Sequence, residues 1–223
     1  MRRHKTLHFF MFLGILLFPV LLSAEPLSMN QIFKRSRIRL ETALKSPGNS
    51  TLSGKISTVK FTNPWLLVFV DYAPSLKAEK TLWLEDVTLE VQVFIPLNQK
   101  KKNQNYLVLS GNTAFRFVMV DGRTRTAVMA VPPQILDRYL PVGRKISTGG
   151  IKAQALFRNG KNTSHTIYYP AGVNEVKHKS EMEDILKKPA TIQVTDGVLP
   201  RENTPWQFMN FDQSDLVWNT QKK

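Results

Sequence analysis

The sequence predicts a mainly antiparallel β-sandwich of the immunoglobulin-like type, with a short C-terminal helix and an extended tail. Three observations lead to this fold class. Seven or more short segments alternate apolar and polar residues or are rich in β-branched and aromatic residues. Turn-forming Gly, Pro and Asn separate these segments, and regular helices are not interposed between them. Because the sequence lacks the cysteine pair that marks many immunoglobulin domains, an OB-like or jelly-roll barrel remains the main rival.

The first 24 residues have the organisation of a signal peptide. Arg2, Arg3 and Lys5 form a positively charged start, residues 7–22 are apolar and uncharged, and Ser23-Ala24 offers small residues for cleavage. This apolar run is short for a membrane span, and retention as an uncleaved anchor is the alternative. No later stretch of the sequence is long and apolar enough to span a membrane. We therefore expect an exported protein, periplasmic or secreted.

The mature protein is predicted to be strongly basic. Loss of the three cations of the signal peptide reduces the formal net charge from +14 to +11. Outside the cytoplasm, a basic protein meets anionic glycans, acidic lipid headgroups and acidic protein surfaces before it meets nucleic acid, although the charge alone could serve only solubility. The absence of cysteine excludes disulfides, thiolate metal sites and a cysteine nucleophile.

The N-terminal half reads as a short helix followed by strands. Residues 26–33 fit the helix, because Ser28 and Gln31 have capping-box spacing. Strand patterns then occupy residues 36–45, 56–61, 65–73 and 82–95. The segment WLLVFVDYA at 65–73 is mostly apolar, which is typical of a strand buried on both faces. The last strand alternates clearly and is predicted to bury Val87, Leu89, Val91 and Val93.

The central stretch, residues 113–140, is predicted to form a hairpin and a helical turn. Asp121-Gly122 is a two-residue hairpin signal, and Pro132-Pro133 ends the second strand and opens the helical turn. Phe115, Phe117 and Met119 share a face that we expect in the core, with Arg116, Val118 and Val120 on the other face. Just before this stretch, Gly111-Asn112 is predicted to turn the chain after a short strand at 106–109.

The C-terminal part is predicted to add a second hairpin, a helix and an aromatic tail. Residues 151–158 and 166–169 pair around Asn159-Gly160, and residues 191–194 form a short strand. Residues 175–188 form a helix with an apolar stripe of Val176, Met182, Ile185 and Leu186. We expect a β-sandwich domain over residues 25–174, with its sandwich at about 36–170. Residues 175–223 then pack on it as a helix plus aromatic tail.

The sequence contains no recognisable catalytic, cofactor or metal motif. His165 and His178 are not at ligand spacing, and we expect both to be exposed or edge residues. The acidic clusters at 85–86 and 181–184 fit a strand entrance and a helix face rather than a carboxylate pair. A nucleophile elbow and a glycine-rich phosphate loop are also missing. We predict no enzymatic activity and no cofactor, with a hydrolase of unrecognised site as one alternative.

The candidate binding residues are basic and aromatic. Arginine suits bidentate recognition of carboxylate, sulfate or phosphate groups. The basic set could gather near hairpin tips, and the tail between Pro200 and Pro205 is held extended. A nucleic-acid surface is not predicted, since the phenylalanines beside Arg116 are expected in the core. The predicted partner-binding residues are Lys100, Lys101, Lys102, Arg116, Arg123, Arg125, Arg201 and Trp206.

Three segments resemble a known family when they are taken together: WLLVFVDYA at 65–73, AVMAVPPQILDRYL at 127–140 and VLPRENTPWQF at 198–208. Their layout resembles the immunoglobulin-like periplasmic accessory proteins of type IV pilus-like assembly systems. The resemblance implies a sandwich fold, no catalysis and protein partners in an envelope machine. We therefore predict a protein that mediates protein–protein interaction in a cell-envelope assembly, with binding of anionic surface or wall glycans as the alternative.

Overall fold

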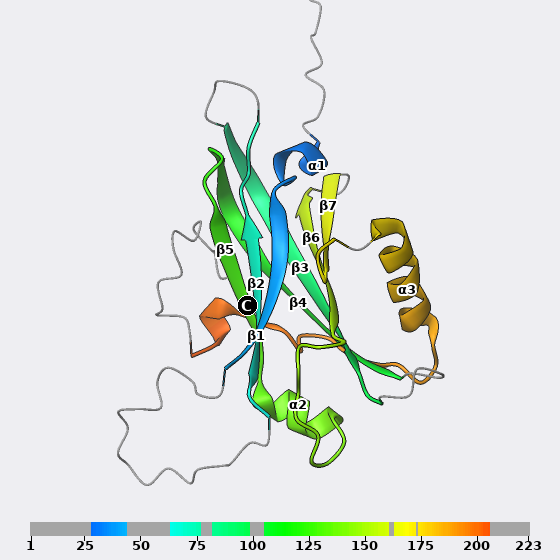
Figure 1. The fold of residues 1–223 in the computed structure, drawn as a ribbon. Helices are drawn as coiled ribbons and strands as arrows, with labels where there is room; N and C mark the ends of the chain where they lie inside the picture. The colour runs from blue at the N-terminus through cyan, green and yellow to red at the C-terminus, as the bar shows by residue number, and fades with distance from the viewer. Residues whose placement is uncertain are drawn as a thin grey trace, which may run out of the picture.

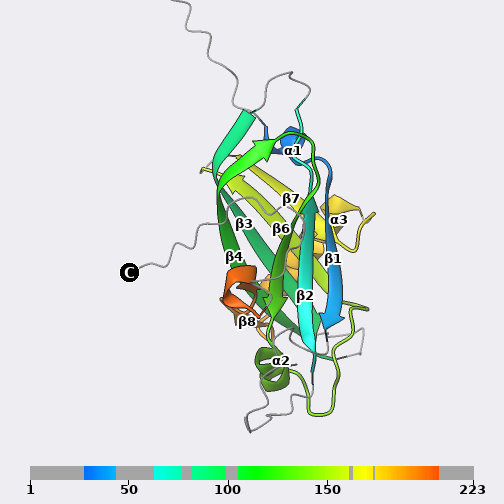
Figure 2. The same cartoon turned by 90° about the vertical axis from the view of Figure 1, so that its left-hand side faces the viewer.

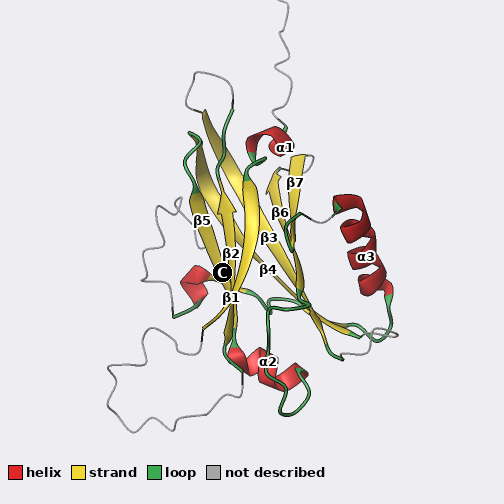
Figure 3. Ribbon diagram, in the orientation of Figure 1, coloured by secondary structure: helices red, strands yellow, loops and turns green. Residues whose placement is uncertain are grey.

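The described part of the protein consists of two β-sheets packed face to face, with three α-helices and a short 3-10 helix around them (Figures 1 and 3). The computed structural model describes residues 28–43, 63–76, 82–98, 105–160, 163–172 and 174–205. Within these residues the strands form two separate sheets rather than a closed barrel. The predicted two-sheet sandwich is therefore confirmed. In the described part of the chain, no helix has the length and apolar character needed to cross a membrane.

The first sheet has four strands in the order β1-β2-β5-β9, all antiparallel. They are β1 (Ser36–Ala43), β2 (Trp65–Tyr72), β5 (Arg125–Val131) and β9 (Leu199–Pro200). The second sheet has five strands in the order β7-β6-β3-β4-β8, with β8 parallel to β4 and the other pairs antiparallel. They are β3 (Leu82–Pro96), β4 (Tyr106–Val120), β6 (Lys152–Asn159), β7 (Thr163–Tyr169) and β8 (Ile192–Val194).

The core lies between the sheets, where sequence alternation predicts it. Val87, Leu89, Val91 and Val93 are all 0% exposed, and nearly every residue of β2 is buried. One end of the sandwich is closed by α1 (Met29–Ile32). Phe33, which follows α1, stacks on Phe157 with ring centroids 4.3 Å apart, and Tyr72 packs against both rings. The predicted strand at 56–61 lies outside the described residues.

Two further helices lie where the sequence predicts them. α2 (Pro133–Tyr139) begins at the second proline and buries Leu136, while α3 (Glu175–Lys187) is capped by the Asn174 side chain. α3 covers the outer face of β3 and β4, where Met182 and Ile185 pack in a cluster with Phe94, Tyr106 and Val108. The predicted helical stripe is wrong at Val176, which is 80% exposed. His178 is buried instead, because positions 178, 182 and 185 form the row that faces the sheet.

Gly111 is not in a turn, contrary to the sequence prediction, but inside the continuous strand β4. The chain that joins β8 to β9, residues 195–198, crosses β4 at this glycine; we call it the strap. A Cβ atom on Gly111 would lie 1.8 Å from the carbonyl oxygen of Val198, and the Val198 amide donates to the Ser110 oxygen at 3.2 Å. Glycine is therefore required here because a second backbone segment approaches too closely for any side chain, which is a common reason for glycine within a strand.

Asp121-Gly122 also differs from its prediction, because β4 and β5 belong to different sheets. The dipeptide does turn the chain, with Gly122 at φ 76° and the Asp121 side chain accepting a hydrogen bond from the Arg123 amide. Gly122 then donates its amide hydrogen to Pro74 of the segment after β2. This contact directs β5 into the sheet of β2, so the turn links the two layers rather than forming a hairpin.

The alternation of β3 and β4 shifts by one residue near Asp86, which has a positive φ of 53°. Leu84 and Val87 both face the core on β3, as do Phe115 and Val118 on β4. As a result Phe117 and Met119 are only half-buried, whereas Val118 and Val120 are buried. The prediction of a core face formed by Phe115, Phe117 and Met119 is thus correct only for Phe115.

Replacing Gly111 by alanine is expected to destabilise the fold strongly. The added methyl group would overlap the Val198 carbonyl, so the strap would have to move away from β4. Overpacking of this kind costs about 3 kcal/mol. The free energy of unfolding, measured with urea, should fall by that order. The matched control is Gly149→Ala, whose new Cβ would meet its nearest neighbour at 3.6 Å. Equal stabilities of the two variants would contradict this account of the strap.

Candidate functional site

The structure separates the predicted arginines by their exposure. Arg116 lies in β4 and is exposed, and the Arg123 side chain is 70% exposed in the turn after β4. Arg201 is half-exposed in the short 3-10 helix η1 (Arg201–Asn203), whose Glu202 lies 3.5 Å from Thr113 in the middle of β4. The prediction that the chain between Pro200 and Pro205 is held extended is therefore wrong for these three residues. Lys100, Lys101, Lys102 and Trp206 lie outside the described residues. The four described arginines of the predicted set are therefore spread over β4, the turn that follows it, β5 and η1 rather than gathered in one patch.

Arg125 differs from its neighbours because it is only 6% exposed. Its guanidinium donates two hydrogen bonds to the Asp121 carboxylate, at 2.8 and 3.1 Å, and one to the Arg123 carbonyl at 3.3 Å. The hydrogen bonds from Arg125 are the main reason that the pKa of the Asp121 carboxyl lies below its usual range, and the Arg123 amide lowers it further. The geometry gives Arg125 a role in fixing the turn, which leaves Arg123 as the more accessible of the two for a partner.

The outer edge of β4 is covered along only part of its length. β8 pairs with Leu107–Leu109, and the strap adds one hydrogen bond at Ser110. From Asn112 onward, no described strand lies on this edge. β5 is similar, because β9 pairs only with Met129 and Ala130. Figure 2 views this side of the molecule, with β8 and η1 at the lower end and the upper parts of β4 and β5 beyond them.

An aromatic patch lies beside the uncovered part of β4, and the sequence does not predict it. Trp83 is 53% exposed and meets the ring of Phe117 edge-on, with centroids 6.5 Å apart. Met119 of β4 lies opposite Trp83 in the strand pairing, and the Arg116 guanidinium lies 5.4 Å from the centroid of the Phe117 ring. We call these four residues the Trp83 patch. The patch depends on the shift of alternation near Asp86, whose positive φ of 53° has no signal in the sequence pattern.

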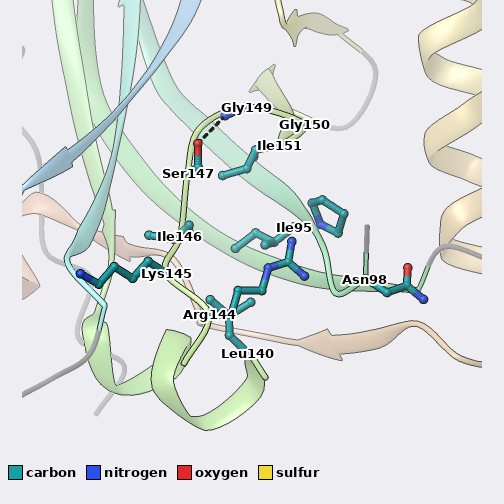
Figure 4. Close-up of a pocket in the computed structure, with 11 residues that line it drawn as sticks. Ile95, Asn98, Leu140, Arg144, Lys145, Ile146, Ser147, Gly149, Gly150 and Ile151 are labelled. Carbon is teal, nitrogen blue, oxygen red and sulfur yellow. Dashed lines mark hydrogen bonds between the residues drawn. The ribbon is translucent and has the colours of Figure 1, made fainter. Parts of the chain in front are cut away.

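A hollow of about 520 Å³ lies at the opposite end of the sandwich, beside the C-terminal end of β3 (Figure 4). Its walls come from the ends of β3 and α2 and from the loop that follows α2. In Figure 4 the Arg144 side chain extends toward Ile95, whereas Lys145 points the other way. The full lining is Ile95, Pro96, Asn98, Leu140, Arg144, Lys145, Ile146, Ser147, Gly149, Gly150 and Ile151.

A second hollow of about 510 Å³ adjoins the first, since both are lined by Gly150 and Ile151. It lies between β6 and the N-terminal turns of α3 and includes Lys152, Lys177 and Glu181. The Lys152 ammonium donates a hydrogen bond to Glu181 and thereby lowers the pKa of that carboxyl. His178 lines this hollow but is itself buried, with Nε2 3.0 Å from the Tyr169 oxygen.

The described residues offer little for a metal ion or for acid–base chemistry. No group of three or more His, Asp or Glu side chains that could hold a metal lies among them. His165 is half-buried in the edge strand β7, and burial lowers its pKa. The prediction that both histidines are exposed or edge residues is wrong for His178, because the buried row of α3 includes it. Among the described residues, the two hollows and the edge of β4 are the larger features that could receive a ligand.

Comparison with known proteins adds a likeness of fold. A crystal structure of a protein from Akkermansia muciniphila superposes with a TM-score of 0.57 at 13% sequence identity, covering 84% of this chain and 97% of the other. At this identity the likeness concerns the fold alone. No family model matches the sequence, and a search of curated proteins found no match.

Arg125→Gln and Arg123→Gln are expected to differ in stability. Arg125→Gln leaves the Asp121 carboxylate without its buried partner and should lower the free energy of unfolding by about 1–3 kcal/mol at neutral pH. Arg123→Gln should change it little, since this side chain is largely solvated. Urea denaturation of both variants measures the difference.

The effect of Arg125→Gln should also depend on pH. Because the pKa of Asp121 is depressed in the folded protein, its contribution is present above the ordinary carboxyl range and is lost as pH falls through the folded-state value. The stability gap between Arg125→Gln and the natural protein should therefore shrink in acid. A gap that stays constant down to the lowest pH at which the protein folds would contradict the pairing.

Proposed function

We propose that this protein is an exported, non-catalytic, immunoglobulin-like β-sandwich that binds other proteins in a cell-envelope assembly, of a pilus- or secretion-related kind. Its place of action is the periplasm or the cell exterior, as the N-terminal signal pattern indicates. The partner contributes an extended strand that adds to the uncovered edge of β4. The uncovered edge is the single observation that carries the proposal.

An uncovered strand edge is a site for main-chain pairing. Edge strands present unpaired N–H and C=O groups, and proteins that do not use them cover, shorten or charge them. β8 and the strap pair with this edge only as far as Ser110, although β4 continues to Val120. Beyond Ser110, η1 approaches β4 at Thr113, through the Glu202 side chain, without adding a strand. Strand addition gives affinity through main-chain hydrogen bonds and specificity through side chains on alternate positions. The exposed stretch is long enough for several such bonds.

The direction of the backbone groups follows from one hydrogen bond. The Ser110 carbonyl accepts from the strap, so it points away from β3. In a regular strand every second residue has its N–H and C=O on the same edge, which places those of Asn112 and Ala114 on the uncovered side. Thr113 and Phe115 then pair with Leu89 and Val87 of β3.

The Trp83 patch supports the same proposal. Aromatic residues, methionine and arginine are enriched at the centres of protein interfaces, and this patch contains all three kinds. It lies on the outer face of β3 and β4, where side chains of an added strand would project beside Phe117 and Met119. Arg123 at the adjoining turn offers an exposed cation to an acidic residue of the partner. The envelope setting itself rests on the signal pattern and on the family resemblance of the sequence.

A proline on the uncovered edge should block partner binding. Ala114→Pro removes an N–H that faces the partner but takes no part in the pairing with β3. A photo-crosslinking residue at Asn112 in the full protein, produced in its native cells, should give discrete adducts with envelope proteins. Those adducts should disappear with Ala114→Pro and weaken with Trp83→Ser.

The matched control for the patch is Val176→Ser, which alters an equally apolar, 80% exposed residue on α3. This control should leave the adducts unchanged. Circular dichroism should show that all three variants fold like the natural protein. If Asn112 gives no more adducts than a crosslinker at Lys179, or if Ala114→Pro folds and keeps them, strand addition is not the mode of binding.

A further inference from the structure

The two adjoining hollows are separate but have two lining residues in common, and we call them together the groove. They meet at Gly150 and Ile151 and together extend from Asn98 to His178. Four cationic residues contribute to the lining of the groove, with Glu181 as the one carboxylate residue, and Glu181 is already bound by Lys152. The cations are Arg144, Lys145, Lys152 and Lys177. This imbalance makes the groove a site of positive potential, where low-dielectric walls strengthen attraction for anions.

Arg144 is the cation best placed to contact a ligand. Its side chain is half-buried and extends into the first hollow beside Ile95 (Figure 4). The ion pairs among the described residues do not include it. A guanidinium in this position can donate two parallel hydrogen bonds to one carboxylate or sulfate group. Lys145 points away from the hollow and adds only its more distant charge.

The wall that carries Arg144 is held in place by buried hydrogen bonds. Asn63, 5% exposed, accepts from the Ile146 amide at 2.7 Å and donates to Asp137 of α2 at 2.8 Å. The Arg144 amide closes a turn on Pro141 at 3.0 Å, and Ile151 packs in the main core. The groove therefore exists before any ligand binds, and the ordering cost of binding is small.

The shape and lining of the groove fit a sugar chain better than a peptide. It crosses the ends of strands and offers no strand edge for main-chain pairing, which extended peptides use. Each hollow is also many times larger than a small anion, because a water molecule, which is of similar size to a small anion, occupies only about 30 Å³ in the liquid. Ser147, whose oxygen accepts from the Gly149 amide, keeps its hydroxyl hydrogen for a ring oxygen. Polar groups of this kind suit sugar hydroxyls.

The geometry points to a binding site for an acidic glycan, with a carboxylate or sulfate group on Arg144 and the sugar chain continuing past Gly150 toward Lys177. This site is separate from the edge of β4, so the glycan proposal and the strand-addition proposal can each be correct without the other.

Calorimetric titration of the full exported protein tests the site with four probes. Oligogalacturonate presents carboxylates, short heparin presents sulfates, malto-oligosaccharide is neutral, and oligoglutamate is an acidic peptide. We expect an acidic sugar chain to bind and the neutral one not to, with affinity that falls as salt rises. The acidic sugar that binds more tightly shows whether the site prefers a carboxylate or a sulfate group.

Variants locate the binding within the molecule. Arg144→Gln should weaken the acidic sugar about tenfold or more, because a charge-assisted hydrogen bond is lost. Lys177→Gln should weaken it less, and Lys179→Gln, an equal charge change on the same helix outside the groove, should leave it unchanged. The proposal is overturned if acidic and neutral sugars bind alike, or if Arg144→Gln behaves as Lys179→Gln does. Arg144-dependent binding of oligoglutamate at equal affinity would assign the groove to acidic peptides instead.

Discussion

The backbone contact between Gly111 and Val198 determines which parts of this sandwich are closed and which are open. The strap crosses β4 at the one residue that has no side chain there, and so joins β8 of the second sheet to β9 of the first. With the strap in this position, both sheets gain a short covering strand at the same end. Because the covering strands are only three and two residues long, the remaining edges of β4 and β5 continue beyond them.

The two candidate surfaces differ in the physics that each would use. The edge of β4 offers backbone hydrogen-bonding groups next to an exposed indole ring, which favours another polypeptide. The groove beside Arg144 offers guanidinium and ammonium groups on a preformed wall, which favours an anionic ligand. α3 is the element that keeps them apart, because it covers the lower outer face of β3 and β4 and provides one wall of the groove.

The sequence predicted elements well where local pattern alone decides them. The buried β2, the alternation of β3, the Pro-Pro start of α2 and the helix α3 all follow from periodicity and capping. It failed where one local signal has two outcomes: Gly111 permits a turn or a close crossing, and Asp121-Gly122 can turn within a sheet or between sheets.

The candidate sites were less predictable because distant residues form them. Arg123 and Arg125 look alike in the sequence, yet only tertiary packing buries Arg125 against Asp121. The groove brings together Asn98, Arg144 and Lys177, which no spacing rule connects. The Trp83 patch depends on the shift of alternation at Asp86. Amide hydrogen exchange along β4, followed by NMR in the isolated protein, tests the central claim most directly. We expect slow exchange at Val108, Thr113 and Phe115 and fast exchange at Asn112 and Ala114, whereas uniform protection from Val108 to Phe115 would contradict an open edge.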